Sequence, residues 1–298
     1  MTDTLVSYPR GDLTCTGVIL GVHAMAGCAD AVVVTTDKSC FHPVDPRWRD
    51  QRGDQGQLFV QDRGFNVVDT VVVTVPKTGG PVRVDREIEV KRGDDSVYWR
   101  VGHVVAGRLE ELAAYGLQCH AQVRGVVEHV PRRDLSRSHS ACHLAALALN
   151  TATHRLWRKP IATDSLGHWD FDQTVIARSD ILEDGSLDVY RIGKSAKKAG
   201  LAVDCVVTEL EQIAREINAL LQHWLCAGSA ISVTPACGRV TDRRLWSTQL
   251  DGQRAVIPCG GTHAQSLAEL GPVRVSLTRG PAEPELSMRT TIERMGSE

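Results

Sequence analysis

The chain has 298 residues, of which 42% are hydrophobic and 23% are charged, so it can form two ordinary domains or one large one and is too apolar to be disordered. Its net charge of −2 excludes a globally basic surface, so any contact with nucleic acid must come from local basic clusters. Nine irregularly spaced cysteines and a start without a secretory signal predict free thiols in a cytoplasmic protein. The longest uncharged stretch, 217–238, contains amide, His and Pro side chains and is not expected to span a membrane.

Residues 1–128 are expected to form a β-rich N-terminal domain. Runs of β-branched residues at 31–36 and 66–75 predict strands, and apolar residues that alternate over 82–90 predict a further, half-buried strand. The polar segment 45–57 is expected to be a loop. Several short strands at this spacing favour a small β-barrel-like domain or a sandwich.

Residues 129–298 are expected to form a second domain that contains both helices and strands. A segment rich in Ala and Leu predicts a helix over 140–157 with Ser138 as its N-cap, and apolar residues three or four positions apart predict a helix over 205–225. Strands are expected at 254–257 and 271–277. Because helices and strands are mixed rather than regularly alternating, the expected fold class is α+β.

Two histidines, His139 and His143, lie four positions apart near the start of the first predicted helix. Residues at this spacing share one helix face, with Cβ atoms about 5–6 Å apart, which suits two ligands of one metal ion. This spacing also occurs often by chance, so the pair alone indicates a metal site only weakly.

A second candidate pair, Cys259 and His263, follows the predicted strand 254–257. Between them, Gly260, Gly261 and Thr262 predict a tight turn whose backbone N–H groups could bind a substrate; the alternative is an ordinary surface turn. Together with the histidine pair, 116 positions earlier, this pair supplies three imidazoles and one thiolate. Such a donor set suits Zn²⁺ better than Mg²⁺ or Ca²⁺, which prefer oxygen ligands.

The motif HSACH at 139–143, followed far downstream by CGGTH at 259–263, resembles the editing domain of alanyl-tRNA synthetases and of AlaX-type trans-editing deacylases. The resemblance to threonyl-tRNA synthetases is looser. Arg132-Arg133 and the segment 211–218 also resemble segments of this family. Segment 33–58 resembles its first domain, except that HPVDP at 42–46 replaces a Gly-rich stretch and leaves the role of this loop open.

The resemblance implies a synthetase-type editing domain with a Zn²⁺ site over 129–298. It also implies hydrolysis of the aminoacyl ester of a misacylated tRNA. The family default is Ser or Gly on alanine tRNA, and the altered N-terminal segment also allows a threonine analogue such as fluorothreonine on threonine tRNA. Four protein ligands saturate a tetrahedral ion, so zinc could activate water, bind the substrate or be structural. No general base is identifiable, and the catalytic residues stay unknown.

Several basic residues are candidates for contacts with tRNA phosphates, although such clusters are more often solvated surfaces. They are Arg132, Arg133, Arg191, Lys194, Lys197 and Lys198. Two other functions remain open. One is a zinc-dependent hydrolase that acts on a free small molecule, and the other is an RNA-binding module with a structural zinc. The sequence does not indicate the oligomeric state.

Overall fold

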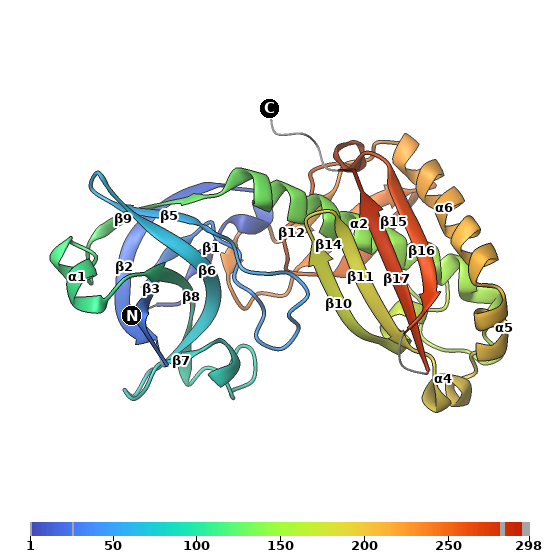
Figure 1. The fold of residues 1–298 in the computed structure, drawn as a ribbon, viewed down its shortest axis with the longest axis horizontal. Helices are drawn as coiled ribbons and strands as arrows, with labels where there is room; N and C mark the ends of the chain where they lie inside the picture. The colour runs from blue at the N-terminus through green and yellow to red at the C-terminus, as the bar shows by residue number, and fades with distance from the viewer. Residues whose placement is uncertain (1, 26, 281–283, 294–298) are drawn as a thin grey trace. The chain divides into compact units, whose positions relative to one another are not determined.

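The computed structural model describes residues 2–25, 27–280 and 284–293, which form a mixed α+β chain (Figure 1). The predicted fold class is confirmed at this level. The chain divides into two compact units. Unit 1 comprises Met1–Arg132, Val233–Arg244 and Gly260–Thr262, and unit 2 comprises Arg133–Ser232, Leu245–Cys259 and His263–Glu298.

Unit 1 contains a large antiparallel sheet with the strand order β5-β9-β2-β3-β8-β6-β7. Because β5 also pairs with β6, the first six of these strands close into a hydrogen-bonded ring. The strands are β2 (Thr14–Met25), β3 (Cys28–Thr36), β5 (Gly56–Val60), β6 (Arg63–Pro76), β7 (Arg83–Val84), β8 (Val97–Ala106) and β9 (Gln122–Val127). A smaller sheet joins β13 (Gly238–Arg239), β1 (Leu5–Val6) and β4 (Lys38–Ser39), and the helix α1 (Leu109–Ala114) precedes β9.

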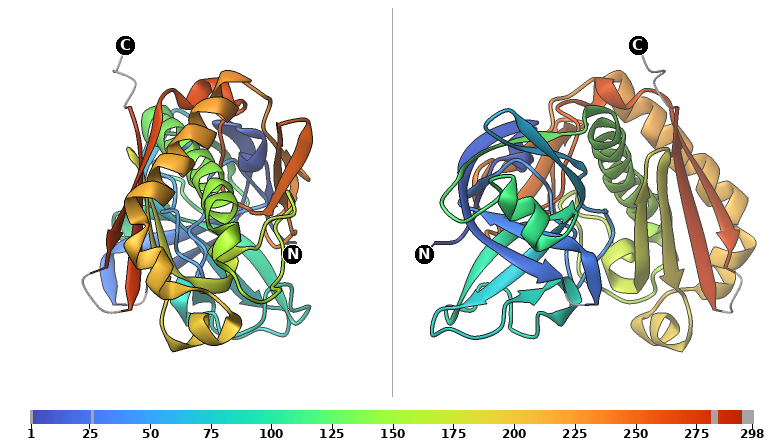
Figure 2. Two further views of the ribbon diagram at one scale, coloured as in Figure 1. Left: turned by 90° about the vertical axis from the view of Figure 1, so that its right-hand side faces the viewer. Right: turned by 60° about the vertical axis from the view of Figure 1, so that its left-hand side comes forward.

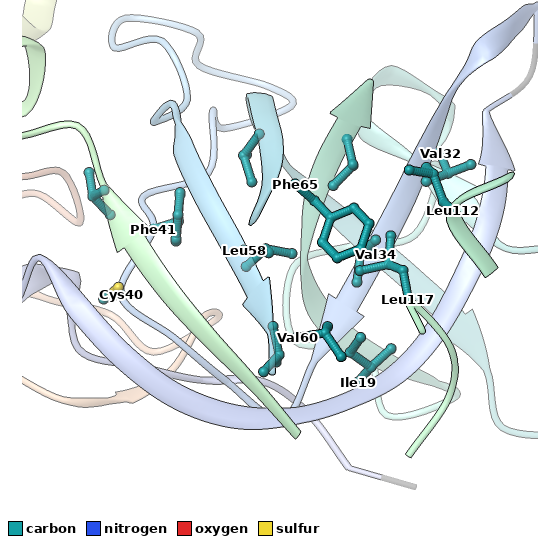
Figure 3. Packing of buried hydrophobic residues seen from close by; sticks show 14 residues of the cluster. Ile19, Val32, Val34, Cys40, Phe41, Leu58, Val60, Phe65, Leu112 and Leu117 are labelled. Carbon is teal, nitrogen blue, oxygen red and sulfur yellow. The ribbon is translucent and has the colours of Figure 1, made fainter. Parts of the chain in front are cut away.

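Buried apolar side chains from the ring strands form the main core of unit 1. Figure 3 shows Ile19, Val34, Leu58 and Phe65 pointing toward one another between the strands. Each large apolar side chain buried in this way contributes about 1.5–3 kcal/mol. The core explains why the β-branched runs of the sequence form strands, since alternate residues of each strand face it.

The prediction of a strand over 82–90 is wrong beyond Val84. Only Arg83–Val84 pairs with β6, and the 3-10 turn η2 (Asp85–Glu87) follows. Asp85 has a φ of 51°, in the left-handed region that interrupts an extended strand. The alternating pattern misled the prediction because Ile88 is buried from this turn, in a cluster with Trp99, rather than from a strand.

Unit 2 contains an antiparallel sheet with the order β10-β11-β17-β16, and α2 and α6 lie on one of its faces (Figures 1 and 2). The strands are β10 (Ile176–Leu182), β11 (Gly185–Arg191), β16 (Val273–Arg279) and β17 (Glu285–Ile292), and the two long helices are α2 (His129–Thr153) and α6 (Leu210–Cys226). On α6, Asn218 holds the edge strand β16, because its amide donates to the carbonyl of Val275 at 2.8 Å and accepts from the N–H of Val275 at 2.9 Å.

The remaining elements of the second half are short. They are η3 (His154–Leu156), α3 (Phe171–Val175), α4 (Lys194–Ala199), α5 (Val203–Thr208), β12 (Ser232–Thr234), β14 (Leu245–Leu250), β15 (Gln253–Pro258) and η4 (Leu267–Leu270). In the hairpin of β14 and β15, Leu245 pairs with Pro258, so Cys259 follows directly after the last paired residue.

Both predicted helices are present with different bounds. Helix α2 begins at His129, so Ser138 lies inside it and is not the N-cap. Pro131 is compatible with this earlier start, because the N–H groups of a first helical turn have no acceptor within the helix. The helix predicted over 205–225 is divided at Glu209 into α5 and α6.

A polar cluster is buried between α2 and the sheet of unit 2. The carboxylate of Asp188 accepts hydrogen bonds from Ser179 Oγ at 2.6 Å and Ser186 Oγ at 2.8 Å, and Cys142 Sγ on α2 lies 3.6 Å from both carboxylate oxygens. Nearby, Asp172 accepts from the hydroxyl of Tyr190 at 2.9 Å. Burial, reinforced by the charge of Asp188, raises the pKa of Asp172 to about 7.

We expect the stability of the protein to fall between about pH 4 and pH 7 because of Asp172. In this range the folded state holds a proton that the unfolded state, with an ordinary pKa near 3.8, has already released. At about 1.4 kcal/mol per pH unit, the loss is roughly 2–4 kcal/mol. Asp172→Asn should flatten this part of the profile in urea denaturation, whereas Asp180→Asn, at a partly exposed position, should leave it unchanged. An unaltered profile for Asp172→Asn would exclude this carboxyl as the cause.

Candidate metal centre

Four potential ligands come together in unit 2. His139 and His143 lie on α2, Cys259 follows β15, and His263 comes after the turn that begins at Cys259. Their ligand atoms all lie within 4.8 Å of one another. The sulfur of Cys259 lies 3.4 Å from Nε2 of His139 and 3.3 Å from Nε2 of His263. Two residue pairs that are distant in the sequence therefore form one group that could hold a metal ion.

The spacing of the donors suits a small tetrahedral ion. Bonds of about 2.0–2.1 Å to nitrogen and 2.3 Å to sulfur place neighbouring ligand atoms about 3.3–3.6 Å apart. For a sulfur–nitrogen pair the expected separation is about 3.5–3.6 Å, and the two distances in the structure, 3.4 and 3.3 Å, are only slightly shorter. Nε2 of His143 is buried and has no hydrogen-bond partner in the described part of the chain. A metal ion would satisfy this nitrogen, so the residues present fit such a group.

The electrostatic environment keeps the imidazoles of α2 neutral. Burial lowers the pKa of His139 to about 4. Burial, together with the neighbouring His139, lowers the pKa of His143 well below its usual range. Near neutral pH both side chains therefore keep an unprotonated nitrogen, which metal coordination requires.

Ser140 orients the ring of His263. Its hydroxyl lies 3.3 Å from Nδ1 of His263, 3.1 Å from the N–H of Ala264 and 3.0 Å from the carbonyl of Ser136. A hydroxyl has one proton and two acceptor positions. Ser140 fills them all if it donates to Ser136 and accepts from Ala264 and from a protonated Nδ1. This arrangement leaves Nε2 of His263 as the unprotonated nitrogen that faces Cys259.

Ser140→Ala should weaken metal binding about 10–100-fold, because the ring of His263 would lose the hydrogen bond that fixes its orientation and tautomer. Competition with a chromogenic chelator measures this affinity. Ser138→Ala is the matched control: Ser138 is fully buried on the same helix, and its hydroxyl has no hydrogen-bond partner among the residues described. Equal affinities for the two variants would contradict the positioning role.

Trp246 forms an aromatic wall beside the group. It lies on β14 and is fully buried, with its ring centroid 5.2 Å from that of His143 in an edge-to-face arrangement and 6.2 Å from that of His263. An apolar wall of this kind excludes water and lowers the local dielectric constant, which strengthens interactions with a bound cation. Neither Ser140 nor Trp246 was expected from the sequence. Ser140 lies inside the HSACH motif, whereas no pattern marks Trp246.

The turn residues between Cys259 and His263 differ in their surroundings. A Cβ added to Gly260 would meet no atom within 4 Å, so there is open space beside this residue. Gly261 and Thr262 are buried. Within unit 1, the amide of Gln51 donates to Thr262 Oγ1 at 2.8 Å and accepts from the N–H of Thr262 at 3.3 Å. The hydroxyl and the N–H of Thr262 are thus both engaged by Gln51, which leaves Gly260 as the most accessible of the three expected substrate contacts.

The structure separates the basic candidates into two groups. Arg132 is only 4% exposed, and its guanidinium forms hydrogen bonds with the carboxylate of Asp54. This burial leaves Arg132 no access to a phosphate, so we do not retain it as a tRNA contact. Arg133 is partly exposed and its Nε lies 3.0 Å from Asp134.

The second group is solvent-exposed on unit 2. Arg191 ends β11, and Lys194, Lys197 and Lys198 lie on the following short helix, α4. Lys197 forms an exposed ion pair with Asp204 at 3.3 Å. Such pairs contribute little stability, so the cluster remains available for an anionic partner.

The sequence matches no model of a known protein family, and no curated protein shows significant similarity to it. No described helix is both long enough and apolar enough to cross a bilayer. The functional argument therefore depends on the residues and geometry of the metal centre.

Proposed function

We propose that the group formed by His139, His143, Cys259 and His263 binds Zn²⁺ and that the protein hydrolyses the aminoacyl ester of a misacylated tRNA. The observation that carries this proposal is the convergence of the HSACH and CGGTH motifs into one donor group, with ligand atoms within 4.8 Å of one another. The same two motifs carry the resemblance to AlaX-type and synthetase editing domains. Neutral imidazoles and a thiolate are the donors that Zn²⁺ prefers.

On this proposal, the second half of the chain is a synthetase-type editing domain and the strand ring of unit 1 is its small β-barrel-like companion. A contact between two segments that resemble the family supports this view. Asp54, in segment 33–58, forms a buried ion pair with Arg132, in the basic pair Arg132-Arg133. The α6 segment that resembles the family contains Asn218, which holds strand β16.

The residues of the site would divide the work of ester hydrolysis among them. Bound Zn²⁺ would supply Lewis acidity to polarise the ester or to hold the substrate amino group. Ser140 fixes the orientation of His263, and Trp246 excludes water from one side. On this proposal, Gly260, where an added Cβ would meet no atom within 4 Å, is the turn residue that contacts the aminoacyl group, such as Ser, Gly or a threonine analogue.

A panel of charged tRNAs tests the proposal directly. Alanine tRNA carrying Ala, Ser or Gly, and threonine tRNA carrying Thr or fluorothreonine, are incubated with the zinc-loaded protein, and the release of each amino acid is followed. We expect release of at least one non-cognate amino acid at a much higher rate than Ala or Thr. Addition of a chelator to the same reactions provides the control. Absence of release from every tRNA would exclude the deacylase.

The complete set of four protein donors favours one alternative, an RNA-binding module with a structural zinc, because closed tetrahedral sites are typical of structural zinc. The same panel separates the two functions. A binding module would shift tRNA in a gel-mobility assay without releasing any amino acid. A third candidate, a zinc hydrolase of a free small molecule, would neither bind tRNA nor be inhibited by uncharged tRNA.

We propose that the exposed cluster of Arg191, Lys194, Lys197 and Lys198 contacts tRNA phosphates. The double variant Lys194→Ala/Lys198→Ala should weaken tRNA binding and reduce the slope of log affinity against log salt by about one for each phosphate that the protein no longer neutralises. Filter binding at several salt concentrations measures both quantities. Lys91→Ala, at an exposed site on unit 1, provides the control. A slope equal to that of the unmodified protein would remove this cluster from the interface.

A further inference from the structure

Two thiols of unit 1 lie close together. Cys15 is on β2, and Cys40 follows directly after β4. The N–H of Cys40 donates to Cys15 Sγ at 3.2 Å, and the side chains of the two residues also interact by a hydrogen bond. Figure 3 shows Cys40 within the apolar cluster, where it is fully buried, whereas Cys15 packs against this cluster and is partly exposed. Cys15 is therefore the more exposed residue of the pair.

The surroundings of Cys15 favour its thiolate. Its sulfur receives hydrogen bonds from the thiol of Cys40 and from backbone groups of Cys40 and Gly125, and together they lower the pKa of Cys15 despite its partial burial. Gly125 pairs with Cys15 between β2 and β9. A side chain at this glycine would cover the sulfur, because an added Cβ would lie 3.1 Å from Cys15 Sγ. The thiol of Cys40 shows the opposite shift, because the neighbouring Cys15 and burial both raise its pKa.

We propose that Cys15 and Cys40 form a peroxide-reactive dithiol, in which Cys15 is oxidised first and Cys40 then closes a disulfide bond. The geometry carries this inference, since a partly exposed cysteine and a buried cysteine are joined by hydrogen bonds. Low-pKa, accessible cysteines next to a second cysteine are the sites where reversible oxidation occurs most readily. The proposal concerns unit 1 and is independent of the metal centre.

The chemistry balances with hydrogen peroxide as the oxidant. The Cys15 thiolate attacks one peroxide oxygen, the O–O bond breaks, and the departing hydroxide takes up a proton to become water. Cys15 is then a sulfenic acid without negative charge, which removes one of the causes of the raised pKa of Cys40, the charge of the neighbouring Cys15. The sulfur of Cys40 attacks the sulfenic sulfur, an S–S bond forms, and the second oxygen leaves as water with the proton of Cys40. The two sulfurs supply the two electrons that reduce the peroxide.

The full-length, zinc-loaded protein is treated with one equivalent of hydrogen peroxide, quenched with an alkylating reagent, digested without reductant and analysed by mass spectrometry. We expect a peptide pair linked through Cys15 and Cys40 that disappears on treatment with dithiothreitol. Cys119, an exposed thiol in the same unit, is the internal reference and should react at least about tenfold more slowly. Oxidation of Cys119 at the same rate as Cys15, without the linked peptides, would refute the proposal.

Two variants separate the two steps. Cys40→Ala should leave a sulfenic acid on Cys15 that dimedone traps, and Cys15→Ala should abolish both the dimedone adduct and the disulfide. Cys119→Ala should behave like the unmodified protein. Cys40 is part of the core, so if its variant misfolds the decision rests on the unmodified protein, which requires no substitution. Absence of a dimedone adduct on Cys15 in a folded Cys40→Ala protein would overturn the assignment of the first step.

Discussion

Cys259→Ala is expected to abolish stoichiometric metal binding and aminoacyl-ester hydrolysis together. Its sulfur lies 3.4 Å from Nε2 of His139 and 3.3 Å from Nε2 of His263, so the substitution removes the donor that lies beside two of the three imidazoles. Removal of a hydrogen-bond partner behind a metal ligand already costs about 10–100-fold in metal affinity or activity, and removal of a ligand itself should cost more. Metal content per protein and the deacylation rate should both be measured on the same preparation.

Cys237→Ala is the matched control, because it removes an exposed thiol that does not belong to the donor group. This control should retain both metal and activity. If Cys259→Ala loses its metal but deacylates at the full rate, the metal is dispensable for the chemistry. Retention of metal by Cys259→Ala would instead remove the thiolate from the ligand set.

Asp54→Ala is expected to lower the free energy of unfolding by about 3–5 kcal/mol, because it leaves a buried guanidinium without its anionic partner. The side chain of Arg132 is 4% exposed and that of Asp54 is 2% exposed. Nε of Arg132 lies 2.9 Å and 3.0 Å from the two carboxylate oxygens, and Nη2 also donates to the carbonyl of Cys40 at 2.8 Å. Urea denaturation followed by circular dichroism measures the change.

The double variant Asp54→Ala/Arg132→Met tests the reason for this loss. It removes both charges and keeps an apolar chain in the space of the arginine, so it should recover a large part of the lost stability. The exposed pair of Arg178 and Asp180 provides the contrast, since Asp180→Ala should change stability by less than about 1 kcal/mol. A double variant less stable than Asp54→Ala alone would contradict the unpaired-charge explanation.

The candidate metal donors were predictable from the sequence because each pair is recognised from residues that lie within five positions of one another. The spacing of His139 and His143 places them on one helix face, and the glycines after Cys259 allow the chain to return at His263. The donor chemistry then links the two pairs without any knowledge of the fold. The mixed α+β class was predictable for a similar reason, since helical and strand periodicities are short-range patterns.

The features that were missed depend on partners distant in the sequence. Arg132 was expected at the surface, but Asp54, 78 positions away, gives it a buried partner. The early start of α2 and the turn at Asp85 depend on how the surrounding chain packs. The hydroxyl of Ser140 acquires its role from His263, 123 positions later. Residue types alone do not show such pairings, because the relevant distances exist only after folding.

The separation of the donor pairs also sets the order in which the metal centre can form during translation. His143, the later of the two helix histidines, is synthesised 116 residues before Cys259, so the sequence of α2 is complete long before Cys259 is added. In a small zinc finger all ligands emerge almost together, and the ion drives the folding of a short segment. On the proposed assignment, a metal ion can bind all four donors only after residue 263 has been synthesised. On this assignment, nascent chains that stop before Cys259 should leave the ribosome without a stably bound metal ion.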